Sequence, residues 1–182
     1  MGLRIPKIIL LIINIVGGIL VLGSYAYGIR EHPAEQGALL WGGVPKEAWP
    51  IYGFSMILAA VGYFLFTFFI LFKISSDVKI FKNLGFNVFH LIYLLILLPS
   101  AVWMPLTFKM IREPSVATWF WIRFLLAVVG LASLALLVAL LSLDYAGPKT
   151  FYWLAVSGAV FFAFHTGVLD AIVWTFFFNP KI

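Results

Sequence analysis

The sequence predicts an all-α fold, an integral membrane bundle of five transmembrane helices. Hydrophobic residues make up 64% of the 182 residues and charged residues only 10%, too few polar side chains to cover a soluble domain of this size. Five apolar runs each reach the length of about 20 residues with which a helix crosses a bilayer. They cover residues 8–28, 50–72, 84–106, 118–142 and 151–178. Little chain remains outside them, so we expect one multi-pass domain over 1–182, with the lipid bilayer as its surroundings.

The first run follows Arg4 and Lys7 but is long and lacks a small-x-small cleavage pattern, which favours a mature helix over a signal peptide. It contains Val16-Gly17-Gly18 and Gly23-Ser24, small residues that let another helix backbone approach closely. We therefore predict that this helix packs inside the bundle. The small-residue faces of the first and last helices also predict that a homodimer can form.

The connector 29–49 is the one segment of any size between the runs. Within it, Trp41 and Trp49 bracket a Pro-Lys pair, which indicates a folded loop against the lipid headgroups. Two interpretations stay open, because tryptophan is enriched as an interfacial anchor and a loop of this kind could equally cover a pocket. A proline directly after Trp49 opens the second run, at a first-turn position where its missing N–H costs no helical hydrogen bond.

The third run carries Pro99 inside an apolar stretch, which predicts a kink where a neighbour or a cavity satisfies the freed carbonyl. Ser100 and Trp103 follow, three residues apart, and should point the same way. The fourth run begins among aromatic residues with Arg123 and continues as a plain aliphatic helix, typical of a scaffold or a lipid-facing element.

The last run contains Asp170 in a stretch otherwise suited to hydrocarbon. A charged carboxylate at that depth costs a few kcal/mol, so such residues face the bundle interior and have a partner or a function. Steps of three and four place it on a face of small and polar residues with Ala159, Ala163, Thr166, Gly167 and Trp174. The opposite face, which we expect to meet lipid or bulky side chains, consists of Phe161, Phe164, Val168 and Ile172.

Two basic residues come into question as partners of Asp170. Arg123 starts on the same membrane side, roughly 7 Å inside its helix end against roughly 12 Å for Asp170, so a structural ion pair is predicted, unless the long stem turns to the interface instead. His165 precedes the aspartate by five residues, about 140° around an α-helix, which places the two on different faces.

A haem held between His90 and His165 is excluded by depth, because the two histidines differ by roughly 12 Å along parallel helices. Cysteine is absent, which removes thiolate ligands and disulfides. The sequence shows no metal constellation, no phosphate loop and no nucleophile-base pattern. It also has no basic cluster for nucleic acid. We therefore predict no metal site, no catalytic residues and no nucleic-acid partner.

Several segments together resemble one membrane family. Residues 16–24 are similar to a glycine-rich first helix that ends in Gly-Ser, and residues 41–50 to a Trp-Tyr-x-x-Leu-x-Lys-Pro-x-Trp loop with proline and lysine exchanged. Residues 61–63 match a Met-Gly-x segment. Residues 100–108 resemble Asn-x-x-Trp-x-Pro-Leu-Phe-Phe with Ser100 for asparagine, and residues 169–174 resemble Leu-Asn-x-x-Ile-Trp with Asp170 for asparagine.

These segments resemble the translocator protein family, also called tryptophan-rich sensory proteins, over nearly the whole chain. That family binds tetrapyrroles such as protoporphyrin and haem, sterols and synthetic aromatic ligands in a pocket under the first loop. The resemblance implies a porphyrin or haem as ligand rather than as a fixed cofactor, and a sensor, receptor or transport role. It singles out as ligand-binding positions Trp41, Trp49, Ser100, Trp103, Phe162, Thr166 and Asp170.

We therefore predict a membrane protein that binds a hydrophobic, planar ligand, tetrapyrrole or sterol-like, between its helices under the 29–49 loop. A membrane enzyme is the first alternative, with Asp170 and either His165 or Arg123 transferring protons on a lipid-like substrate. The second alternative is a structural or assembly subunit that has no ligand, in which Asp170 and Arg123 pair.

Overall fold

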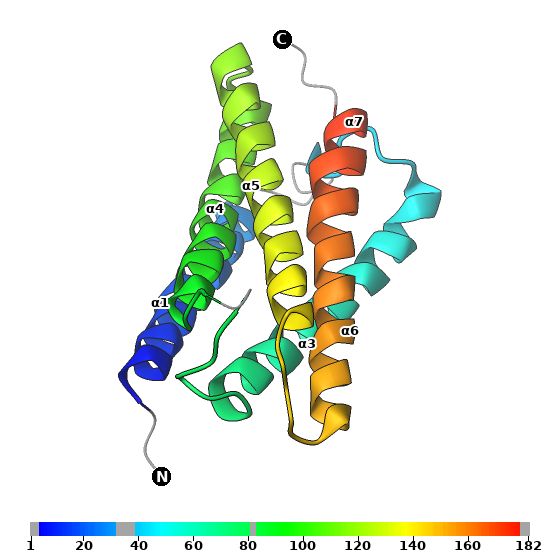
Figure 1. Ribbon diagram of the computed structural model, residues 1–182. Coiled ribbons are helices and arrows are strands. Elements are labelled where there is room, and N and C mark those ends of the chain that lie inside the picture. Colours follow the sequence, from blue (N-terminus) through cyan, green and yellow to red (C-terminus); the bar gives the residue numbers. More distant parts are fainter. Residues whose placement is uncertain (1–3, 32–38, 81–82, 179–182) are drawn as a thin grey trace.

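The computed structural model describes residues 4–31, 39–80 and 83–178. Five spans are long and apolar enough to cross a membrane, so the predicted five-helix bundle and its multi-pass membrane location are confirmed. The first four spans are α1 (Ile5–Glu31), α3 (Trp49–Phe72), which the short η1 (Lys46–Ala48) precedes, α4 (Asn87–Arg112) and α5 (Val116–Leu141). The last consists of α6 (Lys149–Ala163), the π-helix η2 (Phe164–Trp174) and α7 (Thr175–Phe177) (Figure 1).

Local sequence signals account for several helix ends. Proline occupies the first turn of α3, as predicted. Ser115 caps α5, because its hydroxyl accepts a hydrogen bond from the Thr118 backbone N–H. The helix α4 continues through Pro99 and Pro105 to Arg112, so its proline-containing half stays helical.

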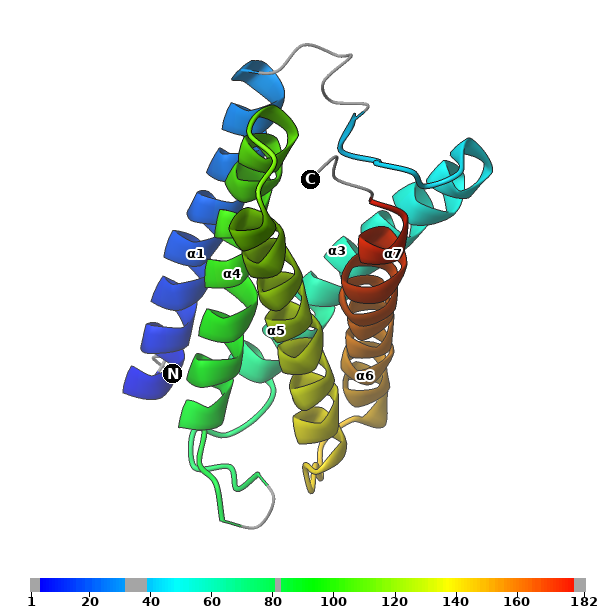
Figure 2. The ribbon, with the colours of Figure 1, turned by 90° about the horizontal axis from the view of Figure 1, so that it is seen from above.

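The spans follow one another around the bundle in the order α1, α4, α5, last span and α3. The helices at the two ends of this series, α1 and α3, also meet. The side-chain oxygen of Asn14 in α1 accepts a hydrogen bond of 2.6 Å from the Tyr63 hydroxyl of α3. Beyond this contact α1 and α3 diverge toward the end at which residues 39–48 lie (Figures 1 and 2).

The helix α1 lies at the edge of the bundle, and the prediction that it packs inside was wrong. Its buried glycines, Gly17 and Gly28, lie against α4, where a Cβ added at Gly17 would come 2.7 Å from the Leu97 side chain. Gly18 and Gly23 have no neighbour within 4 Å. The small residues Gly17 and Gly28 thus form a line of close contact with α4, here called the seam. Most of the large side chains of α1 face outward.

An apolar groove of about 430 Å³ runs along this edge between α1 and α4. Gly23 and Ser24 line it on the side of α1, and Ala101 and Val102 on the side of α4. The homodimer expected from the small residues stays a prediction, and this groove is the place at which it can be tested.

Neighbouring glycines of α1 offer a matched test of the seam. We expect Gly17→Leu to lower the midpoint of thermal unfolding, because the new side chain overlaps Leu97 and pushes α1 away from α4. Gly18→Leu should leave the midpoint unchanged, because its side chain enters open space. Circular dichroism of both variants in one detergent measures the difference, and equal midpoints would show that the seam does not pass through Gly17.

The buried side chains form two clusters along the bundle. The larger cluster joins α1, α3, α4, α5 and α6, with Phe66, Phe69, Phe89, Tyr93 and Leu136 among its fully buried members. The smaller cluster joins residues 39–52 to α4, α5 and the last span, and it includes Tyr52, Ile122, Leu169, Trp174 and Phe178. Four partly buried tryptophans surround this smaller cluster, which makes one end of the bundle rich in indole rings.

Candidate ligand site around Asp170

The last span has the two faces that its sequence predicts. Ala159, Thr166 and Trp174 of the small and polar face are buried, and Phe161 and Ile172 of the opposite face are exposed. Asp170 belongs to the inward face and lies about 10 Å from the end of the span. The carboxylate is therefore directed at neighbouring helices and away from acyl chains.

A π-helix, η2, changes the geometry around Asp170. Its hydrogen bonds join residues five apart, so residue i+5 lies close to residue i. His165 Nε2 is accordingly 3.7 Å from Asp170 Oδ2. The prediction that these residues lie on different faces was wrong, because it assumed α-helical turns, in which five residues rotate by about 140°. Short π-helical turns are rare and are often found at functional sites.

Arg123 does not form the predicted ion pair with Asp170 in the part of the chain that the structure describes. Its guanidinium lies 5.9 Å from the centre of the Trp119 ring, and its side chain is exposed. The Arg123 side chain instead extends toward the surface of the bundle, which was the alternative to the ion pair. Among the described residues, the side chain that lies beside Asp170 is that of His165, at 3.7 Å.

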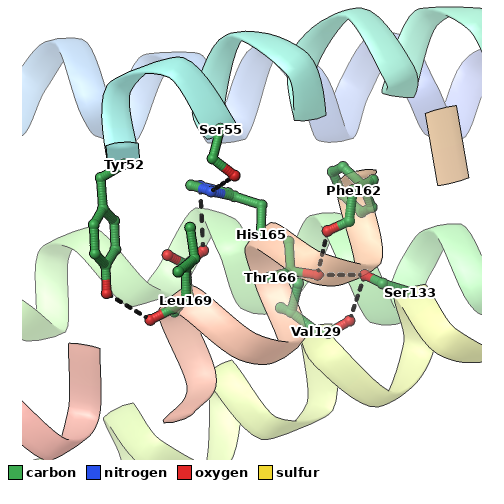
Figure 3. A network of polar contacts seen from close by, with 9 residues as sticks. Tyr52, Ser55, Val129, Ser133, Phe162, His165, Thr166 and Leu169 are labelled. Carbon is green, nitrogen blue, oxygen red and sulfur yellow. Dashed lines mark hydrogen bonds and ion pairs between the residues drawn. The ribbon is translucent and has the colours of Figure 1, made fainter. Parts of the chain in front are cut away.

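Two hydrogen bonds attach η2 to α3 beside this pair. His165 Nδ1 lies 3.1 Å from Ser55 Oγ, and the Tyr52 hydroxyl donates to the Leu169 carbonyl oxygen over 2.9 Å. Figure 3 shows Tyr52 and Ser55 on one helix, reaching toward His165 and Leu169 on the other. The imidazole is therefore held between Ser55 and Asp170, with its orientation fixed from both sides.

A second polar contact attaches η2 to α5. Thr166 Oγ1 lies 2.9 Å from both Ser133 Oγ and the Phe162 carbonyl oxygen, and the Ser133 hydroxyl donates to the Val129 carbonyl over 2.7 Å (Figure 3). Thr166, one of the predicted ligand positions, thus lies in a contact between helices.

Aromatic rings on the α3 side form a first row beside the carboxylate. Trp41 stacks on Trp49, with ring centres 4.8 Å apart and an interplanar angle of 16°. The Trp41 ring also meets the Tyr52 ring edge-on at 5.8 Å, and Tyr52 lies 6.5 Å from the His165 ring. The indole N–H of Trp49 donates to the Val44 carbonyl over 3.1 Å, which fixes the row on residues 39–48.

A second aromatic row connects α1 and α4 to the last span. The Trp103 ring lies 6.0 Å from Tyr25 and 5.6 Å from Trp174. Its indole nitrogen is buried and has no hydrogen-bond partner within the described residues. A buried indole N–H normally has a partner, so this donor is an exception.

Both aromatic rows reach the last span close to Asp170 in the sequence. The Tyr52 hydroxyl of the first row donates to the Leu169 carbonyl, and the Trp103 ring of the second row contacts Trp174. Its side chain is 31% exposed, whereas its neighbours Leu169 and Trp174 are buried. The Asp170 side chain therefore keeps accessible surface in the region where the two aromatic rows reach the last span.

Of the predicted ligand positions, the structure gathers Trp41, Trp49 and Trp103 near Asp170. Phe162 instead lies against Tyr63 and Phe66 in the larger cluster, at ring distances of 5.8 Å and 5.5 Å. Ser100 donates its hydroxyl to the Ile96 carbonyl of its own helix over 2.7 Å.

Sequence reasoning missed Tyr25, Tyr52 and Ser55. Tyr52 could have been found, because it follows Trp49 by three residues and so shares its helical face. Nothing in the sequence marks Tyr25 among the other aromatic residues of α1. The role of Ser55 depends on the position of His165, which the π-helix sets.

The order Ser55, His165, Asp170 resembles the arrangement of a serine nucleophile with its base and carboxylate. The His165–Asp170 distance of 3.7 Å is longer than a hydrogen bond, however. Ser55 is buried within α3, where the neighbouring backbone N–H groups are used in the helix. This arrangement suits the binding or transfer of a proton better than acyl transfer, which needs free donors for an oxyanion.

Comparisons of the chain with models of protein families, with curated proteins and with solved structures find no match.

Proposed function

We propose that the protein binds a hydrophobic, planar small molecule, tetrapyrrole or sterol-like, between α1, α3 and the last span, in a sensor, receptor or transport role. The observation that carries the proposal is the accessible carboxylate of Asp170 between two aromatic rows. Binding sites for such ligands combine apolar and aromatic walls with a few polar groups that fix orientation. Here the polar groups are Asp170 and the indole N–H of Trp103.

The attachment of residues 39–48 to the last span supports a role of this segment as a cover over the site. The indole N–H of Trp174 donates to the Leu40 carbonyl over 2.7 Å, and the Gly43 backbone N–H donates to the Phe177 carbonyl over 3.0 Å. This part of the predicted 29–49 loop is thus attached to the last span, with Trp41 beside Tyr52. Residues 32–38 of the loop lie outside the described residues. The resemblance to tryptophan-rich sensory proteins supports the same location for a ligand.

A titration of the purified protein tests the proposal. The protein in phosphatidylcholine nanodiscs is titrated with protoporphyrin, with haem and with a fluorescent sterol, and tryptophan emission is followed. We expect saturable quenching by at least one ligand, and a midpoint about tenfold higher in Trp103→Leu and in Asp170→Ala, which corresponds to a loss of about 1.4 kcal/mol.

Trp153→Leu is the matched control, because it removes an exposed tryptophan from α6. Its midpoint should equal that of the unchanged protein, although its total emission is lower. Equal midpoints in all four proteins would mean that the ligands only partition into the bilayer. A structural or assembly role without a ligand would then be the better interpretation.

A proton-transfer enzyme acting on a lipid-like substrate is the second candidate, and the 3.7 Å contact between His165 and Asp170 favours it. The mechanism requires the two side chains to converge on one cavity, and their proximity supports it. Mass spectrometry of nanodisc lipids after incubation tests it, with His165→Gln as the inactive comparison. Identical lipid profiles for both proteins would contradict an activity on the lipids supplied.

A further inference from the structure

We propose that the site around Asp170 prefers a ligand that carries a protonated amine over a ligand of the same shape that carries a carboxylate. This inference rests on the proposed function, because it concerns the same site and names the chemical class of its ligand. Three observations lead to it. They are the unsatisfied oxygens of the carboxylate, the lack of a cationic side chain beside them, and the aromatic rings around them.

The carboxylate oxygens of Asp170 accept no hydrogen bond from any residue in the described part of the chain. The closest donor is His165 Nε2 at 3.7 Å, beyond hydrogen-bond distance. The Tyr52 hydroxyl, on the other side, donates to the Leu169 carbonyl. A buried or half-buried carboxylate is costly unless it is hydrogen-bonded, so a ligand that supplies donors would be favoured here. An ammonium group supplies up to three N–H donors, and its charge strengthens each bond.

The groups that face Asp170 from the surrounding helices leave its charge uncompensated. They are Tyr25 from α1, Tyr52 from α3 and His165 from its own helix, and none of these is a lysine or an arginine. Arg123, at the start of α5, lies over the Trp119 ring instead. In its ionised form Asp170 would therefore attract an organic cation and repel a ligand carboxylate.

The aromatic rings complete a site for a cation. Tyr52, with Trp41, contacts the last span at Leu169, and Trp103, with Tyr25, contacts it at Trp174. Ring faces attract cations, and rings of tryptophan and tyrosine do so most strongly. The same rings suit the flat body of an aromatic ligand. The buried indole N–H of Trp103 offers a donor to an acceptor atom on that body.

Three pyrene derivatives with one ring system and different charge test the inference. They are 1-pyrenemethylamine, which is protonated at neutral pH, the uncharged 1-pyrenemethanol, and 1-pyrenecarboxylate. Each is titrated into the protein in nanodiscs of zwitterionic lipid, and energy transfer from tryptophan to pyrene is followed. We expect the amine to bind at least about tenfold more tightly than the carboxylate, with the alcohol in between.

Asp170→Asn keeps the shape of the side chain and removes its charge. In this variant the amine should lose its advantage over the alcohol, because the charge that distinguishes the two probes at this site is gone. Asp144→Asn, at an exposed position after α5, is the control. This variant should rank the affinities of the three probes as the unchanged protein does. Circular dichroism shows whether each variant is folded. If Asp170→Asn fails to fold, the relative affinities of the three probes for the unchanged protein still test the preference for the amine.

The outcomes separate this inference from the proposed function. Saturable binding of all three probes without a preference for the amine would overturn the inference and leave the proposed site standing. An equal preference for the amine in Asp170→Asn would overturn it too, because the lipid or another group would then provide the attraction. If no probe binds saturably, both the inference and the proposed function are contradicted.

Discussion

Gly62→Leu is expected to prevent stable assembly of the bundle. Gly62 of α3 and Gly158 of α6 touch through their backbones, and a Cβ added at Gly62 would lie 2.4 Å from the Gly158 carbonyl oxygen. Because the obstacle is backbone, the two helices must separate along one of the most extensive contacts of the molecule. Overpacking by one methyl group typically costs about 1–3 kcal/mol, so Gly62→Ala should lower the unfolding midpoint clearly, and the leucine variant should lower it further.

The same helix provides the control, because Gly53 has no neighbour within 4 Å. Gly53→Leu should elute as one symmetrical peak in size-exclusion chromatography and unfold like the unchanged protein. Gly62→Leu should aggregate or unfold at a much lower temperature. If both variants behave alike, α3 and α6 do not pack through these glycines, and the arrangement of the bundle described above would be wrong.

Trp174→Ala should destabilise the tryptophan-rich end of the molecule. The indole ring lies 5.6 Å from Trp103 and 4.5 Å from Phe178, and its N–H donates to the Leu40 carbonyl. Removing a large buried aromatic side chain typically costs about 3–5 kcal/mol. Trp174→Phe keeps a ring but loses the hydrogen bond, which is worth about 1 kcal/mol. We therefore expect unfolding midpoints in the order unchanged protein, phenylalanine variant, alanine variant.

Hydrogen exchange distinguishes a local effect from a global one. Backbone amides of residues 39–48 should exchange faster in both variants, because Trp174 attaches this segment to the last span. Trp153→Ala removes an exposed indole from the same span and should change neither the midpoint nor the exchange of residues 39–48. Unchanged exchange there in Trp174→Ala would contradict the attachment.

The membrane bundle could be predicted because span length and hydropathy report directly on the bilayer. The inward face of the last span could be predicted as well, because small residues repeated at helical spacing from Ala159 to Trp174. Hydropathy could not show that α1 lies at the edge. Lipid tails are as apolar as a helix interface, so the sequence does not distinguish a lipid-facing isoleucine from a buried one.

The contacts around Asp170 could not be predicted from the sequence. A change from α-helical to π-helical hydrogen bonds leaves no mark in composition, yet it decides whether His165 meets Asp170. The course of a long arginine stem is equally undetermined, and Arg123 turned to Trp119. Tyr25 and Tyr52 could be assigned to the site only after the rotation of α1 and α3 was known.

Glycine contacts on both flanks make the last span the rigid part of the molecule. Gly158 touches Gly62 of α3 on one side, and a Cβ added at Gly130 of α5 would lie 2.9 Å from Gly167 on the other. The helix α1 packs mainly on α4 and has little contact with α3 beyond the hydrogen bond to Asn14. A bound molecule of larger or smaller size would then be accommodated by displacement of α1, while the negative charge that receives it stays in place.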